Sequence, residues 1–258
     1  MHDILLSIAR EAGDLAMSHF GQLTKSGVSA KGPLDLVTVA DRAVEALIVA
    51  RLRAAFPDDG ILGEEGSGIA GSSGRIWVID PIDGTFNFVR RGREWSISIG
   101  LWDQNRPAFG IVHAPVAGLT LIGGEAMPPE LNGKPLPMLS AFEPEIASVG
   151  FGLGGGAFPL AERMAVLQDL KARAGAMVRI CNSATLAMIE VATGETDAYI
   201  GYGESVWDVM AIWPILTALG ATATLDWQRT SLDAKLRFVV GKPGAVSHCA
   251  GLLPGDVP

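Results

Sequence analysis

WVIDPIDGT, at residues 77–85, is the stretch that decides how this 258-residue chain is interpreted. The apolar residues 76–79 predict a strand that delivers Asp80 to its end, Pro81 stiffens the backbone, and Asp83-Gly84 predicts a tight turn. Two carboxylates three residues apart on such a turn can face one point, where they would repel each other unless a cation lay between them. A surface Asp-Gly turn is the simpler alternative.

Two more acidic segments lie far from this turn in the sequence. They are GEEG at 63–66 and Trp207-Asp208. Magnesium takes oxygen ligands and is usually held by a few carboxylates together with substrate phosphate. The three segments therefore predict one magnesium site. By itself, Asp208 is more simply explained as the cap or dipole partner of a helix predicted at 206–219. Glu65 is equally explained as a solvated acidic side chain.

Collinear motifs along the chain resemble those of a known family. Residues 77–88 look like the signature of the inositol monophosphatase family of magnesium-dependent, lithium-sensitive phosphatases, DLVTVAD at 35–41 resembles its upstream motif, and Trp207-Asp208-Val209 resembles its C-terminal one. Order and spacing agree from about residue 3 to 238. The resemblance implies a magnesium-dependent phosphomonoesterase that acts on a small sugar or polyol monophosphate, forms a homodimer and is inhibited by lithium.

The resemblance also implies a role for each matching residue. Two or three Mg²⁺ ions would be held by five groups: the side chains of Glu64, Asp80, Asp83 and Asp208 and the backbone carbonyl of Ile82. Glu65 would adjoin these groups. Asp41 and Thr85 would form the pair that orients the attacking water. From the residues alone, Asp41 is more simply a carboxylate favoured by the dipole in the first turn of a helix.

Substrate contacts are implied at several of the same positions. Gly84 and Thr85 begin a predicted short helix whose free backbone N–H groups suit phosphate oxygens, and Asp208 faces the same substrate. Asn182-Ser183-Ala184 stands where relatives have a glycine-serine/threonine-alanine element, which suggests Ser183 and Ala184 on the leaving-group side. Arg179 is a further polar candidate there.

The sequence departs from the inositol enzymes where substrate recognition is expected. Phe86 replaces a second threonine, and Gly201 replaces a glutamate that contacts an inositol hydroxyl; Glu204 is nearby but out of register. Lys31 is also displaced from the position of the family's lysine. Fructose 1,6-bisphosphate, histidinol phosphate and nucleotide phosphates therefore remain alternative substrates. A regulatory, protein-binding role is an alternative of a different class.

Composition narrows the class of protein. A hydrophobic content of 48% with 19% charged residues excludes a disordered chain, and a net charge of −8 argues against binding nucleic acid or an anionic membrane. Cys181 and Cys249 form no disulfide framework, which favours a reducing compartment. No secretory signal or long apolar run is visible, so we expect a cytoplasmic protein.

Periodicity predicts the organisation of the chain. The proline-rich segment 135–145 is the expected boundary between an N-terminal α+β domain (1–140), which carries most metal ligands, and a C-terminal α/β domain (141–258), which contributes Asp208. The resemblance implies a layered α-β-α-β-α sandwich with the site between the halves. Residues 66–74 are expected to be a mobile loop that completes the site, or else a disordered connector. Helices are predicted at 4–20, 39–55, 159–173, 183–193 and 206–219, and strands at 60–65, 76–79, 96–102, 109–113, 119–122, 147–151, 177–180, 198–200, 223–225 and 238–240.

Overall fold

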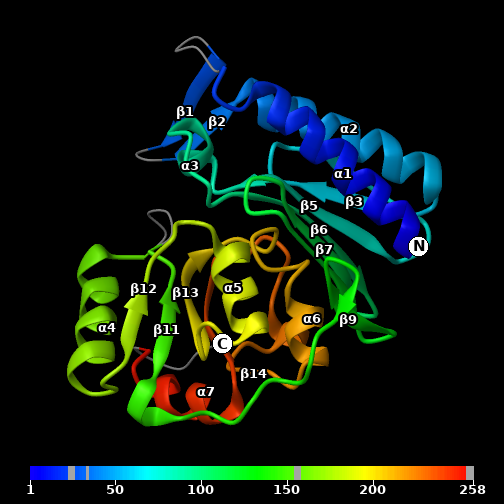
Figure 1. Ribbon diagram of the computed structural model, residues 1–258. Helices are drawn as coiled ribbons and strands as arrows, with labels where there is room; N and C mark the ends of the chain where they lie inside the picture. The colour runs from blue at the N-terminus through cyan, green and yellow to red at the C-terminus, as the bar shows by residue number, and fades with distance from the viewer. Residues whose placement is uncertain (23–26, 33–34, 154–157, 254–258) are drawn as a thin grey trace.

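The computed structural model describes residues 1–22, 27–32, 35–153 and 158–253. In this part of the chain an eight-stranded and a five-stranded sheet alternate with pairs of helices (Figure 1). The helices α1 and α2 cover the outer face of the larger sheet, α5 and α6 lie between the two sheets, and α4 and α7 cover the outer face of the smaller one. The predicted layered α-β-α-β-α fold class is confirmed.

The larger sheet has the order β10-β9-β8-β7-β6-β5-β3-β4. Its strands β3 and β5 are parallel and the other neighbours are antiparallel. A separate hairpin, β1-β2, precedes it. The elements of this half are α1 (His2–His19), β1 (Val28–Gly32), β2 (Asp35–Thr38), α2 (Val39–Ala55), β3 (Gly60–Gly63), β4 (Gly68–Ile69), β5 (Ile76–Asp83), α3 (Thr85–Val89), β6 (Ser96–Asp103), β7 (Arg106–Ala114), β8 (Leu119–Gly124), β9 (Met127–Leu131) and β10 (Lys134–Pro135).

The smaller sheet has the order β12-β11-β13-β15-β14. Its strands β12, β11 and β13 are parallel, while β15 and its neighbours are antiparallel. The elements of this half are η2 (Pro144–Ile146), β11 (Ser148–Phe151), α4 (Leu160–Ala172), β12 (Met177–Arg179), α5 (Ala184–Thr193), β13 (Ala198–Glu204), α6 (Trp213–Ala218), β14 (Thr222–Ala223), η3 (Trp227–Arg229), β15 (Leu236–Gly241) and α7 (Pro243–Ala250).

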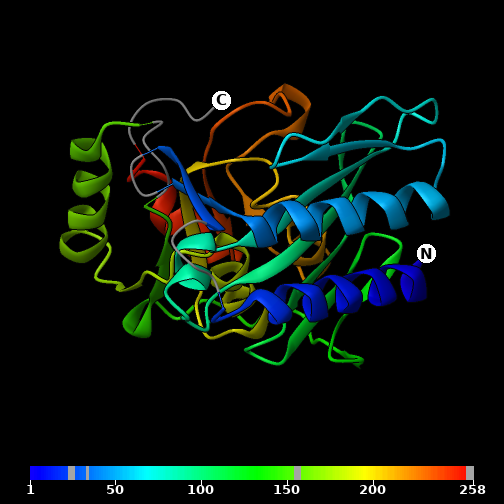
Figure 2. The ribbon, with the colours of Figure 1, turned by 90° about the horizontal axis from the view of Figure 1, so that it is seen from above.

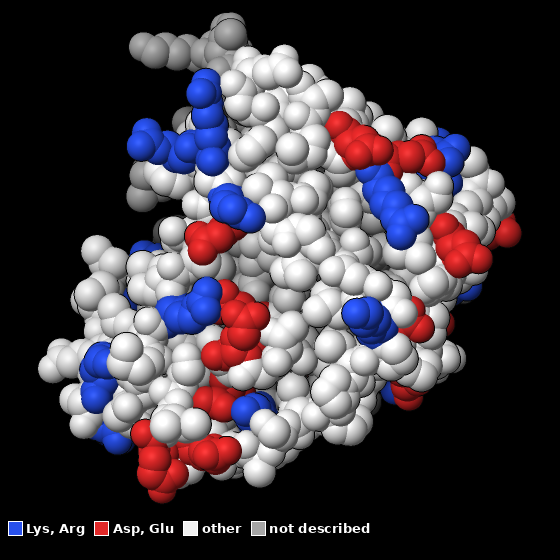
Figure 3. Space-filling model, viewed as in Figure 1, with Lys and Arg blue, Asp and Glu red and all other residues white. Residues whose placement is uncertain are grey.

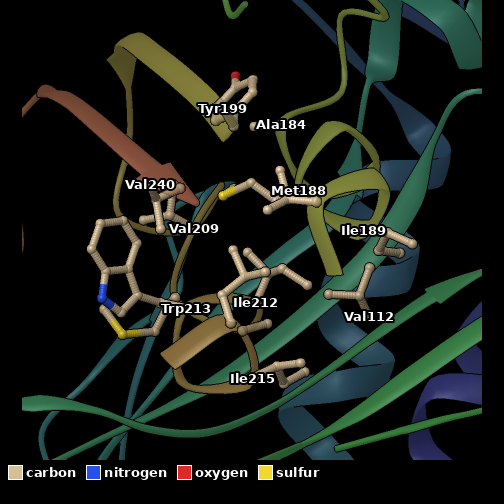
Figure 4. Packing of buried hydrophobic residues seen from close by; sticks show 14 of the residues in the cluster. Val112, Ala184, Met188, Ile189, Tyr199, Val209, Ile212, Trp213, Ile215 and Val240 are labelled. Atoms are coloured by element: carbon tan, nitrogen blue, oxygen red, sulfur yellow. The ribbon is translucent and has the colours of Figure 1, made fainter. Parts of the chain in front are cut away.

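Strand alternation explains the layers. In β5, Trp77 and Ile79 pack towards α1 and α2, whereas Val78 between them faces α5 and α6. Both faces of the sheet are therefore apolar, and each is covered by helices. From above, α1 and α2 run side by side over the sheet (Figure 2). The core of the central layer includes Val112 of the larger sheet close to Ile189 of α5 (Figure 4), so it joins the two halves.

The helix predicted at 206–219 is wrong in its first half. Residues 207–212 form turns, and α6 begins only at Trp213. Pro214 lies in its first turn, where the missing N–H does no harm, whereas a longer helix would need that N–H as a donor. Asp208 consequently lies in the turn before α6 and does not cap it.

Other differences concern short strands. The segment 66–74, expected as a loop, contains β4, and Ser72 and Ser73 donate backbone hydrogen bonds to the carbonyl of Asp58, so a disordered connector is excluded. The hairpin β1-β2 and the strands β9 and β10 were not predicted. Prolines 128 and 129 argue against a strand, but β9 lies near the edge of the sheet, where proline is tolerated. Predicted strands 60–65 and 223–225 end at Gly63 and Ala223 instead.

The surface has no single charge character on the face drawn in Figure 3. Acidic and basic side chains are interspersed there, with basic ones gathered over β1 and α3 at the upper left. Among the described residues, no helix has the length and apolar character needed to cross a bilayer.

Candidate metal centre

A bulge at the end of β5 turns two aspartates towards one point. Asp80 pairs with Ser98 of β6 and Asp83 with Ser96, so three steps along β5 match two steps along β6. In a regular strand, residues three apart point to opposite faces. The extra residue of the bulge removes that alternation, so that Asp80 and Asp83 can share one side.

Asp208 joins these two carboxylates from the other half of the chain. One carboxylate oxygen from each of Asp80, Asp83 and Asp208 lies within 4.8 Å of the other two. Asp208 Oδ2 accepts a 2.6 Å hydrogen bond from the backbone N–H of Ser205, which fixes its turn. Glu64 comes directly after β3, and its carboxyl lies within hydrogen-bonding reach of Asp80. All four predicted acidic ligands are therefore brought together.

The electrostatics of this cluster favour a cation. Burial raises the pKa of Asp80 well above its ordinary value, and the neighbouring Glu64, Asp83 and Asp208 raise it further. The same two causes, burial and the surrounding carboxylates, raise the pKa of Asp208. A divalent cation would remove this repulsion, and hard carboxylate oxygens are the donors that Mg²⁺ prefers. The donor set thus fits Mg²⁺.

Asp83 is held by the first residues of α5. Ser183 Oγ donates to Asp83 Oδ2 at 2.6 Å, the backbone N–H of Thr185 donates to Oδ2 at 2.8 Å, and that of Ala184 donates to Oδ1 at 3.2 Å. The Thr185 hydroxyl also donates to Asp83. Burial raises the pKa of Asp83, while these hydrogen bonds oppose the rise. Ser183 and Ala184, predicted on the leaving-group side, therefore contact a candidate ligand.

The predicted Asp41–Thr85 pair is present. Asp41 Oδ2 accepts from the N–H and hydroxyl of Thr38 at 2.8 and 2.5 Å, which completes the capping box of α2. Its other oxygen, Oδ1, lies 3.2 Å from Thr85 Oγ1, which also lies 3.0 Å from the carbonyl oxygen of Ile82. Burial raises the pKa of Asp41. One carboxylate oxygen of Asp41, Oδ2, thus caps the helix, and the other, Oδ1, contacts Thr85.

Gly84 allows the chain to turn from β5 into α3. Its φ of 89° lies in the left-handed region, and a Cβ there would lie 2.7 Å from the carbonyl oxygen of Glu94. Any other residue would be strained and would also clash. Thr85 then begins α3 beside Asp83.

Comparison with known proteins agrees with this geometry. Residues 1–249 match the sequence pattern of the inositol monophosphatase family. The chain belongs to the inositol monophosphatase family. It is 34% identical to the Nus factor SuhB of Pseudomonas aeruginosa, over 82% of this chain and 80% of that one. It is 33% identical to a fructose-1,6-bisphosphatase/inositol-1-monophosphatase of Thermotoga maritima, over 86% and 83%.

A solved structure shows the same fold. The extragenic suppressor protein suhB of Bartonella henselae superposes with a TM-score of 0.88, over 99% of each chain, at 23% identity. This likeness concerns the fold alone. In this member of the inositol monophosphatase family, the acidic cluster lies where three segments meet: the end of β5, the β3–β4 turn and the turn before α6.

In this member of the inositol monophosphatase family, Gly201 stands in place of the glutamate expected to contact an inositol hydroxyl. A Cβ on Gly201 would lie 2.5 Å from the ring of Phe238, so a glutamate has no space there. Glu204 is buried and accepts a 2.5 Å hydrogen bond from the Tyr199 hydroxyl. Its carboxylate is therefore engaged within the protein, and its pKa is raised by burial.

The remaining candidates lie at the margin. The Phe86 side chain is 41% exposed on α3. Arg179 forms ion pairs with Glu190 at 2.5 Å and with Glu195 at 3.7 Å. The Lys31 side chain lies outside the described residues.

Thr185 and Glu45 contact the site but were not singled out from the sequence. Thr185 contacts Asp83, and the backbone N–H of Glu65 donates to Glu45 of α2 at 2.8 Å. Thr185 could have been found as the residue that follows the Asn182-Ser183-Ala184 motif. For Glu45, a glutamate four residues after Asp41 on an amphipathic helix, the sequence carries no distinguishing signal.

Proposed function

We propose that this chain is a magnesium-dependent phosphomonoesterase that hydrolyses a small sugar or polyol monophosphate. The observation that carries the proposal is the meeting of Asp80, Asp83 and Asp208 within 4.8 Å, with Glu64 beside Asp80. Membership of the inositol monophosphatase family supports it. Two or three Mg²⁺ ions would be held by these four carboxylates and the Ile82 carbonyl, with Glu65 as an adjoining group.

Magnesium at this site would neutralise phosphoryl oxygens and acidify a water molecule. The protein's own part is orientation. The Thr85 hydroxyl has one proton, which it can donate either to Asp41 or to the Ile82 carbonyl. When Asp41 takes that hydrogen bond, the lone pairs of Thr85 Oγ1 are free to accept from the attacking water. Asp41 and Thr85 are thus the proposed catalytic pair.

Substrate binding involves the same region. The backbone of Gly84 and Thr85 is the proposed contact for the phosphate oxygens. Asp208 is the third proposed substrate contact. Because Ser183 and Ala184 hold Asp83, we assign them to support of the metal ligand and not to the leaving group.

The identity of the alcohol is the open part of the proposal. The inositol enzymes carry a glutamate at the position of Gly201, and Phe238 fills that space here. This favours a substrate other than inositol phosphate among the sugar and polyol esters. Fructose 1,6-bisphosphate, histidinol phosphate and nucleotide phosphates are the alternatives, and a Thermotoga maritima relative named as acting on the first supports its inclusion.

A phosphate-release assay with a panel of these esters tests the proposal. We expect magnesium-dependent release from at least one sugar or polyol monophosphate, and inhibition by lithium. Asp83→Asn should abolish release because a charged ligand becomes neutral. Asp59→Asn is the matched control, since Asp59 is also buried in the same half but binds Arg75 and Trp77 instead. No release from any ester would contradict the proposal.

A regulatory role is the second candidate, because one relative is named as a Nus factor. It predicts that Asp83→Asn abolishes hydrolysis but leaves capture of a protein partner unchanged in a pull-down. We also propose a homodimer in the cytoplasm and a division near residues 135–145 between the ligand-rich N-terminal half and the half that carries Asp208. Sedimentation of the purified chain tests the dimer.

A further inference from the structure

Glu45 is a buried carboxylate that contacts the backbone of the β3–β4 turn. It lies on α2, with 3% of its surface exposed. One of its oxygens, Oε2, accepts the N–H of Glu65 at 2.8 Å, and the other, Oε1, accepts the N–H of Ser67 at 3.1 Å. Both carboxylate oxygens are therefore committed to one turn, 20 or more residues away in the sequence.

That turn is the one that carries Glu64. The N–H of Gly63 donates to the Ser67 carbonyl at 2.7 Å, and the N–H of Glu64 donates to the Ile79 carbonyl at 3.1 Å. The N–H of Gly66 also donates to the Gly63 carbonyl, at 3.3 Å. Glu45 accepts two other N–H groups of the turn, those of Glu65 and Ser67, which would be costly to leave without acceptors in a partly buried place.

Gly63 leaves room for this contact. A Cβ at Gly63 would lie 2.5 to 2.8 Å from the carboxylate atoms of Glu45. Glycine at this position lets the Glu45 carboxylate lie against the turn. Substitution of Gly63 would therefore push Glu45 away without changing Glu45 itself.

We propose that Glu45 is a positioning residue for the metal centre: it holds the β3–β4 turn so that Glu64 stays beside Asp80. This inference rests on the metal site of the proposed function. Ser183 and Ser205 donate hydrogen bonds to the candidate ligands Asp83 and Asp208. Glu64 extends from a turn, and α2 supplies the support for that turn through Glu45. Groups that orient a metal ligand in this way commonly contribute 10- to 100-fold to metal affinity.

Asp59 provides the contrast. It is equally buried and accepts hydrogen bonds from Ser73 Oγ at 2.7 Å and Trp77 Nε1 at 3.0 Å. It precedes β3, whereas Glu64 follows β3 at the opposite end. Asp59→Asn therefore controls for loss of a buried, hydrogen-bonded carboxylate that does not support the turn.

The test measures Mn²⁺ binding by the loss of the free-ion EPR signal, with no substrate present. Glu45→Gln can keep only one acceptor, and we expect its Mn²⁺ affinity to fall about 10-fold. Gly63→Ala should give a similar fall with Glu45 intact. Asp59→Asn should bind Mn²⁺ like the wild type, even if its melting temperature drops. In phosphate release, Glu45→Gln should need more Mg²⁺ but recover turnover near the wild-type rate at saturation.

The outcomes are distinct. Glu45→Gln that binds Mn²⁺ as tightly as the wild type would overturn the inference, and so would an equal loss of affinity in Asp59→Asn. A 10-fold affinity difference in a protein that hydrolyses no ester would support the positioning role and contradict only the proposed reaction. A wild type that binds no Mn²⁺ would overturn both.

Discussion

Thr85 of α3 and Asp41 of α2 meet through a 3.2 Å contact between their side-chain oxygens, 44 residues apart in the sequence. The contact uses the Asp41 oxygen that the capping box leaves available. A single carboxylate thus links the start of α2 to the turn that follows the two aspartates of β5. This arrangement allows the role of Asp41 in capping to be separated from its role beside Thr85.

Asp41→Asn should lower turnover by at least about 100-fold, because an amide is a poorer acceptor for the Thr85 proton. Thr38→Ala is the control: it removes the other half of the capping box, costs about 1 kcal/mol of stability, and should leave turnover near wild type. Steady-state kinetics and thermal melts of both variants check this. Equal loss of turnover in the two would assign Asp41 to capping alone.

Ser183→Ala should weaken metal binding about 10-fold, because Asp83 loses its 2.6 Å hydrogen bond and is less well oriented. Ser183 is also the N-cap of α5. Asp226→Ala, which removes the cap of η3 on an exposed loop, controls for loss of a cap in general. Mn²⁺ titrations of both variants make the comparison. Unchanged affinity in Ser183→Ala would mean that Thr185 and Ala184 suffice to orient Asp83.

Gly110→Ala should disturb the metal centre from the face of the larger sheet that packs on the turn before α6. A Cβ there would overlap the backbone of Ala211, which follows Asp208 by three residues. We expect a loss of about 1–3 kcal/mol of stability together with weaker Mn²⁺ binding. Gly251→Ala, where a Cβ meets nothing within 4 Å, is the control. Normal metal affinity in a destabilised Gly110→Ala would show that the Asp208 turn moves independently of the sheet.

His113 should make stability fall in mild acid. Its burial against α1, and then the charge of Arg10, lower the pKa of this histidine below its ordinary value of 6.5. Below pH 6.5 the unfolded chain therefore binds a proton that the folded chain refuses, so the free energy of unfolding decreases as pH drops towards the folded pKa. His113→Gln should reduce this decrease, as measured by urea denaturation in EDTA between pH 7 and 5.

The control for that series is His19→Gln, at the end of the helix that packs on His113. Its pH series is compared with those of the wild type and of His113→Gln. If His113→Gln loses as much stability as the wild type over the same range, the acid sensitivity originates elsewhere.

The layers of the fold and the meeting of the acidic segments could be predicted from the sequence because each depends on patterns that are local or strongly specific. Apolar spacing predicted α1 and α2, and the collinear motifs predicted Asp80, Asp83 and Asp208 in one place. The bulge that turns Asp80 and Asp83 to one side has no separate signature, since Pro81 is compatible with several backbone paths.

What could not be predicted depends on partners that are distant in the sequence or are backbone groups. In the sequence, Glu45 looks like any glutamate on the surface of a helix, and only the folded turn reveals the backbone N–H groups that donate to it. Asp208 was assigned to a helix because the apolar spacing after it is helical, whereas Pro214 delays α6 to Trp213. The strand β9 was not predicted because it contains two prolines, which are tolerated there because β9 lies near the edge of the sheet.

The central claim is that Glu64, Asp80, Asp83 and Asp208 hold the divalent ions on which ester hydrolysis depends. Phosphate release from the ester panel, followed while Mg²⁺ is removed by EDTA and then restored, tests it most directly. We predict that release stops on chelation and returns with Mg²⁺ in the wild type and in Asp59→Asn, but never appears in Asp83→Asn. Release that continues at an unchanged rate in EDTA, or in Asp83→Asn, would contradict the account.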